Sequence, residues 1–115
     1  MSNSSIGRFD EMGELLNHTV KIATTDTSTS LLDLIDAALG VAVERSKIRA
    51  ILITCETNDA RIAIGVAAAL GATPVGHQIA VGQNYRNTSY SQILAAQVIS
   101  LTSGSPATLH CTLEA

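Results

Sequence analysis

The stretch Thr108-Leu109-His110-Cys111-Thr112-Leu113 alternates strictly between polar and apolar side chains. Successive side chains of a β-strand point to opposite faces, so this alternation predicts a strand that is buried on one face only. Leu109, Cys111 and Leu113 form the predicted inward face. The stretch therefore favours a sheet whose inner face is covered by another layer of the same domain.

The two-residue period recurs along most of the chain after residue 19. Residues 48–56 are apolar at both parities, which predicts a central strand that is covered on both faces. The turn residues Thr57, Asn58 and Asp59 follow it, so we expect residues 48–56 and 62–66 to form a hairpin. We likewise expect residues 98–101 and 108–113 to form a closing pair. Further predicted strands lie at residues 19–23 and 77–81 and around Tyr85.

One segment carries the signals of a helix. Ser30 followed by Asp33 resembles a capping box, and Gly40 suits the position that ends a helix. Apolar residues between them recur at helical spacing, at Leu32, Ile35 and Leu39. About seven short strands with one short helix predict a mainly β protein, an antiparallel β-sandwich or a jelly-roll-like barrel.

The chain is expected to divide into residues 1–18, an N-terminal arm, and residues 19–115, the β-sandwich domain. The arm begins with polar residues and ends in a short amphipathic piece in which Met12, Leu15 and Leu16 share one helical face. Such a face needs a partner to cover it. We therefore take Met12, Leu15 and Leu16 as candidate interface residues.

Composition narrows the range of partners. Aromatic residues make up 3% of the chain and Trp is absent, so small aliphatic side chains must fill the core. Because each of these buries less area than an aromatic ring, a homo-oligomer would bury more. The net charge of −3 and the scattered Lys and Arg residues give no basic stripe, so no direct binding of nucleic acid is expected. Neither a membrane span nor a secretory signal is apparent, so synthesis and first residence in the cytoplasm are expected.

No catalytic or metal-binding pattern stands out, so we predict a non-enzymatic protein without a cofactor. Cys55 and Cys111 lie in apolar strand patterns and are expected to be buried free thiols. The three histidines are isolated in sequence, and only His77 lies near a position that a cupin-like metal enzyme would use. That enzyme class is the third-ranked interpretation. The serines around Gly104 are interpreted as an ordinary turn rather than as a nucleophile site.

The most polar and aromatic loop of the chain spans residues 84–90. Tyr85, Arg86 and Tyr90 are the side chains there that are best suited to an exposed contact, and we take them as further interface candidates. Two tyrosines in a β-sandwich also leave open a host-surface or carbohydrate-binding module, which is the second interpretation.

Several segments resemble small β-sandwich proteins that are encoded among the structural genes of tailed phages and prophages. The matching segments are Leu31-Leu32 with Ile35, residues 50–54 leading to Arg61-Ile62-Ala63-Ile64-Gly65, residues 74–83, and residues 107–110. The resemblance implies a virion structural protein, either a capsid decoration or cement protein or a head–tail component. It also implies a symmetric homo-oligomer, often a trimer, that contacts other virion proteins through its arm and sheet surface. Such a protein would occur in the host cytoplasm during assembly and then in the virion.

Overall fold

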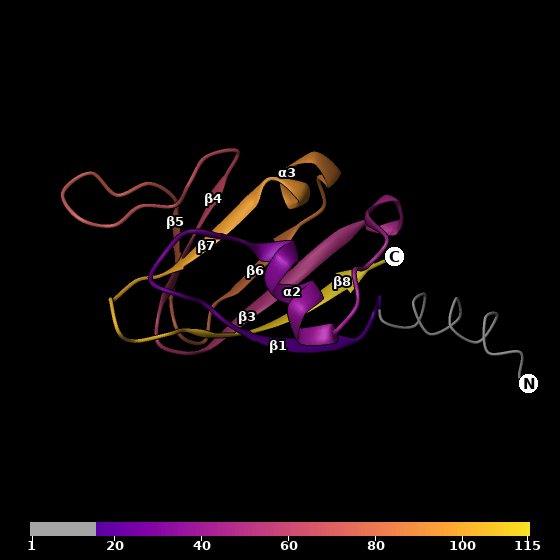
Figure 1. Cartoon of the computed structure of the whole chain (residues 1–115), viewed down its shortest axis with the longest axis horizontal. Helices are drawn as coiled ribbons and strands as arrows, with labels where there is room; N and C mark the ends of the chain where they lie inside the picture. Colours follow the sequence, from indigo (N-terminus) through magenta and orange to yellow (C-terminus); the bar gives the residue numbers. More distant parts are fainter. Residues whose placement is uncertain (1–15) are drawn as a thin grey trace, which may run out of the picture.

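The computed structural model describes residues 16–115, which form two four-stranded antiparallel sheets packed face to face (Figure 1). Sheet A contains, in spatial order, β1 (Thr19–Ala23), β8 (Thr108–Glu114), β3 (Ala50–Thr57) and β6 (Asn84–Asn87). Sheet B contains β2 (Thr29–Ser30), β7 (Ala96–Ser100), β4 (Ala60–Ile64) and β5 (His77–Ile79). The helical elements are α2 (Leu31–Leu39), the 3₁₀ turn η1 (Arg45–Lys47) and α3 (Tyr90–Leu94). The predicted mainly β fold, a β-sandwich, is confirmed.

The core between the sheets is aliphatic, as the sequence predicts. Leu109, Cys111 and Leu113 of β8 all face inward and are buried, and Ile62 and Val98 meet them from sheet B. Helix α2 covers the same core with its buried face, Leu31, Leu32 and Ile35. The predicted ends of this helix are confirmed, because the Ser30 side chain accepts from the Asp33 N–H and Gly40 adopts φ 79°.

Both predicted hairpin pairings are wrong. Strand β3 pairs with β6 and β8, whereas β4 pairs with β5 and β7, so β3 and β4 belong to different sheets. Strands β7 and β8 are likewise split between the sheets. The connection after β3 instead turns a corner. Asn58 has φ 58°, its carbonyl accepts from the Cys55 thiol, and its side-chain amide donates to the Pro106 carbonyl.

Two elements are additional to the prediction. No helix is predicted for residues 90–94, yet they form α3, although the Ser89 side chain makes no capping hydrogen bond. Burial of Ile93 in the core accounts for this helix better than local signals do. Strand β2 occupies the end of a polar run, where it pairs with β7.

The two sheets are joined at one end by a buried polar contact. Thr24 follows β1 in sheet A, and its hydroxyl lies 2.7 Å from the hydroxyl of Ser100 in β7 of sheet B. The Thr24 hydroxyl also accepts from the Ala107 N–H at 2.9 Å. Since buried polar groups are tolerated when they are hydrogen-bonded, this contact is compatible with the surrounding core.

Candidate functional site

The outer face of sheet A is polar and its side chains bond to one another across the strands. These contacts join Thr19 with Thr112, Thr54 with Asn84, Glu56 with His110, and Arg86 with Glu114. Leu52 lies exposed among them, so the prediction that β3 is covered on both faces is wrong for its outer face. A face whose polar groups already satisfy one another is suited to water contact.

The outer face of sheet B is covered by the chain's own β4–β5 connection, residues 65–76, here called loop 65–76. Ala68 of the loop is buried against Ala63 and Ile99 of the sheet. The Ala68 N–H also donates to the Ser28 hydroxyl at 2.9 Å, and that hydroxyl donates to the Gln97 side chain at 2.8 Å. The start of the loop is therefore attached to sheet B by both apolar and polar contacts.

Beyond this attachment the loop extends away from the sheets (Figure 1). Ala69 and Val75 form a two-way backbone bridge, and residues 70–74 make the tip between them. Residues 65–76 contain no charged side chain. Val66 and Val75 are 54% and 40% exposed. Loop 65–76 is therefore an uncharged projection that carries two exposed aliphatic side chains.

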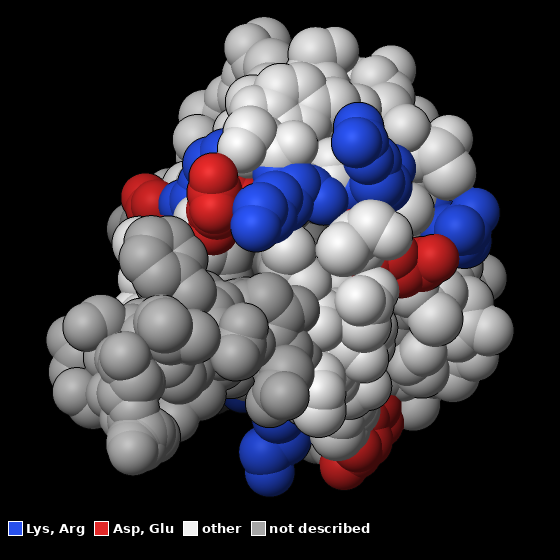
Figure 2. Space-filling view, turned by 90° about the vertical axis from the view of Figure 1, so that its right-hand side faces the viewer, with Lys and Arg blue, Asp and Glu red and all other residues white. Residues whose placement is uncertain are grey.

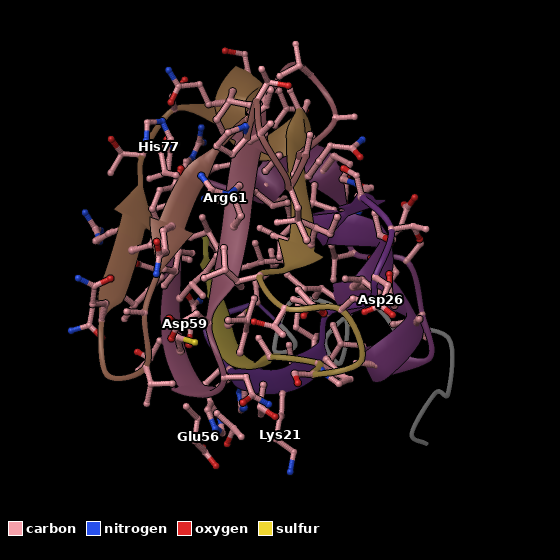
Figure 3. The ribbon with its side chains drawn as sticks, turned by 90° about the vertical axis from the view of Figure 1, so that its left-hand side faces the viewer. Lys21, Asp26, Glu56, Asp59, Arg61 and His77 are labelled. Carbon is pink, nitrogen blue, oxygen red and sulfur yellow. The ribbon has the colours of Figure 1, made fainter. Side chains whose placement is uncertain are left out.

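The return of the loop is fastened at Arg61 and Gly76. Arg61 lies on the outer face of sheet B, and its Nη1 donates to the Gly76 carbonyl at 2.7 Å (Figure 3). Gly76 has φ 119°, and a Cβ atom there would lie 2.7 Å from the Ile62 carbonyl oxygen. Only glycine allows the loop to approach β4 this closely. The Nε of Arg61 is buried and has no hydrogen-bond partner among the residues that the structure describes.

The predicted residues of the arm are not all placed by the structure. Met12 and Leu15 lie outside the described residues. Leu16 is 2% exposed and belongs to the main core, while Asn17 binds the end of β8 through its backbone N–H and side chain. Leu16 as an interface residue is therefore wrong, because this chain's own core covers it. The folded domain includes Leu16 and Asn17, two residues that the predicted boundary assigned to the arm.

The three candidates of residues 84–90 do not form one surface. Tyr85 faces inward, packs against the core and accepts from the Asn87 amide at 2.9 Å. Its neighbour Arg86 points to the opposite face and binds Glu114 through two hydrogen bonds. Tyr90 is 43% exposed at the start of α3. Tyr85 and Tyr90 therefore do not share one exposed surface, because strand alternation turns Tyr85 into the molecule.

Basic side chains gather across the end of the molecule that carries η1 (Figure 2). This row contains Arg45 and Lys47 of η1 and Arg49, whose N–H donates to the Glu114 carbonyl. It also contains Arg86, which binds the Glu114 carboxylate. Most of this charge is compensated, since Arg45 binds Asp36, Lys47 lies 3.8 Å from Glu44, and Arg86 binds Glu114. Arg49 is the one member without an ion pair among residues 16–115.

The Arg45–Asp36 pair is half-buried and fixes the connection after α2. The hydrogen bond to Asp36 raises the pKa of Arg45. Burial raises the pKa of Asp36, but hydrogen bonds from Arg45 and the Val43 N–H and the charge of Arg45 outweigh it, so the pKa of Asp36 is lowered. A contact with a residue nine positions away carries no local signal.

The structure brings no cluster of metal ligands together within residues 16–115. His77 is exposed at the edge of sheet B, whereas Ile79 of the same strand is buried. His110 lies on the outer face of sheet A, as its parity predicts, and contacts Glu56. Cys55 and Cys111 are buried free thiols, as predicted. Burial raises the pKa of Cys111 to about 12 and, together with the charge of Asp59, also raises that of Cys55.

No helix in residues 16–115 has the length and apolar character needed to cross a membrane. The chain matches no protein-family model, and it matches neither a curated protein nor a solved structure. The resemblance to structural proteins of tailed phages therefore stays a prediction from the sequence.

Proposed function

We propose that this chain is a non-enzymatic structural protein that assembles with copies of itself, as a capsid decoration or head–tail component of a phage particle does. The observation that carries the assembly role is loop 65–76, an uncharged projection with Val66 and Val75 exposed. Exposed apolar surface of this kind is characteristic of protein–protein contact sites. The phage setting rests on the sequence resemblance.

The other surfaces of the described residues support the choice of the loop. The outer face of sheet A is occupied by its own cross-strand polar contacts, and the basic row is largely paired with carboxylates. A loop without charge also meets a copy of itself without repulsion between like charges, which an interface around a symmetry axis requires. Self-association is therefore the simplest way to cover it.

The test is the molecular mass of the purified full-length chain over a range of concentrations. Replacing Val66 and Val75 with serine removes about 1 kcal/mol of burial per side chain, or about 4 kcal/mol over the two copies of a symmetric pair, so the double variant should dissociate roughly 1,000-fold more readily. The matched control is Val41→Ser, because Val41 is 42% exposed but lies in the connection between α2 and η1, far from the loop (Figure 1). Wild-type protein that remains monomeric at millimolar concentration would contradict self-association.

The phage assignment has a separate test. A structural gene of a phage lies among other genes for the particle, and its product remains with purified particles. We expect capsid or tail genes beside the gene for this chain and the chain itself in particles analysed by mass spectrometry. Purified particles that lack the chain would refute the virion role without affecting the self-association result.

A further inference from the structure

Arg61 has more hydrogen-bonding capacity than the described residues use. Its Nη1 donates to the Gly76 carbonyl, its Nε is buried without a partner, and no Asp or Glu lies within ion-pair distance among residues 16–115. Its Nη2 makes no hydrogen bond to a described residue and is not among the buried unpaired atoms. The guanidinium thus presents one free edge at the return of loop 65–76 (Figure 3).

A half-buried guanidinium is ordinarily paired with an acid, because burial of an isolated charge is unfavourable. Two other arginines of the same chain, the half-buried Arg45 and the exposed Arg86, are paired with acids. Arg45 and Arg86 each make two hydrogen bonds to one carboxylate, Asp36 and Glu114 respectively. Arg61 has one neutral carbonyl instead. Among residues 16–115, the Arg61 guanidinium therefore lacks the carboxylate partner that Arg45 and Arg86 each have.

We propose that Arg61 binds a carboxylate side chain of a second copy of this chain, which packs against loop 65–76. This inference rests on the self-association proposed above. Arg61 holds Gly76, and Gly76 directly follows the exposed Val75, so the cation and the apolar surface are adjacent. Loop 65–76 has no acid of its own to offer, whereas the chain as a whole has ten Asp and Glu against seven Lys and Arg. An arginine beside apolar side chains is a common centre of binding energy in protein interfaces.

The experiment compares the dissociation constants of the wild-type chain, Arg61→Gln, Arg61→Lys and the control Arg49→Gln, each at several NaCl concentrations. Arg49 is a suitable control because it also lacks an ion pair among residues 16–115 but lies at the η1 end. We expect Arg61→Gln to dissociate roughly 10- to 100-fold more readily, and Arg49→Gln to stay within about twofold of wild type. The dissociation constant of Arg61→Lys should lie between those of wild type and Arg61→Gln. An ammonium keeps the charge but cannot make two parallel hydrogen bonds to one carboxylate. Wild-type association should also weaken more with salt than that of Arg61→Gln.

The outcomes distinguish failure of the carboxylate site from failure of the self-association. Equal dissociation constants for Arg61→Gln and Arg49→Gln would overturn the carboxylate site. A weakened Arg61→Gln with the salt dependence of wild type would overturn it too, because Arg61 would then only position the loop through Gly76. Monomeric wild-type protein would remove the proposed self-association itself, and this is visible before any variant is made. If Arg61→Gln does not fold, the dissociation constant of Arg61→Lys and its dependence on NaCl concentration test the carboxylate site instead.

Discussion

The closest backbone approach in the loop gives the sharpest prediction, Gly76→Ala. Gly76 has φ 119°, which L-residues avoid, and an added Cβ would lie 2.7 Å from the Ile62 oxygen and 2.9 Å from the Arg61 Cγ. The first of these contacts is with strand backbone, so it cannot be relieved by turning a side chain. The substitution must therefore move the loop away from β4 or distort β4 itself.

The expected loss of stability in Gly76→Ala has two contributions, one from the backbone conformation and one from the close contact. A non-glycine residue in a disfavoured region with positive φ costs about 1–2 kcal/mol. Forcing an extra carbon into a packed contact costs about 1–3 kcal/mol more. The expected loss in the free energy of unfolding is therefore about 2–5 kcal/mol. Gly71→Ala separates the two terms, because Gly71 lies in the same loop with φ 95° but would have no atom within 4 Å of its Cβ.

Urea unfolding followed by circular dichroism measures both variants against wild type. We expect Gly71→Ala to lose only the backbone term, about 1–2 kcal/mol, and Gly76→Ala to lose at least 1 kcal/mol more than Gly71→Ala. Equal losses in the two variants would refute the close contact between Gly76 and β4. An unchanged Gly76→Ala would also refute the statement that the loop is fastened there.

Three further predictions concern the core and its polar contacts. Thr24→Val leaves the Ala107 N–H and the Ser100 hydroxyl unpaired, so urea unfolding should show a loss of about 2 kcal/mol, and a loss below 0.5 kcal/mol would contradict it. Burial raises the pKa of Cys111 to about 12, so above pH 9 only the unfolded chain loses this proton and stability falls, by about 1.4 kcal/mol at pH 10. Cys111→Ala should lack this part of the decrease between pH 7.5 and pH 10, and identical decreases would exclude the effect. Asp36→Asn should cost about 2 kcal/mol at pH 7, and because the pKa of Asp36 is lowered by Arg45, the difference from wild type should vanish as the pH falls well below 4.

The sequence predicts side-chain direction in this chain better than strand pairing. Leu109, Cys111 and Leu113 face inward as predicted, because the alternation of polar and apolar residues directly states which side of a strand is buried. The turn at residues 57–59 has the same composition whether it closes a hairpin or carries the chain to the other sheet. The choice depends on contacts such as that of Asn58 with Pro106, forty-eight positions away, which no local pattern contains.

The sequence does not predict helix α3, for a related reason. A five-residue helix has too few turns to show a helical period, and Ser89 gives it no side-chain cap. Its formation depends on the burial of Ile93 beneath the other elements. The earlier helix α2 was predicted because both of its ends are encoded locally, by Ser30 and by Gly40. Local signals thus sufficed where the ends of an element are chemically marked, and failed where tertiary packing alone makes the element.

The candidate assembly surface likewise depends on tertiary contacts more than on local sequence signals. The exposure of loop 65–76 depends on its contacts with Ser28 and Arg61, which lie outside the loop. These contacts hold the loop at both of its ends before any partner arrives. A contact surface that is already held in place loses less conformational entropy on binding than a free segment does. Loosening the loop at Gly76 and removing its valines should therefore weaken assembly by different routes, the first through the entropy of ordering the loop and the second through lost apolar burial.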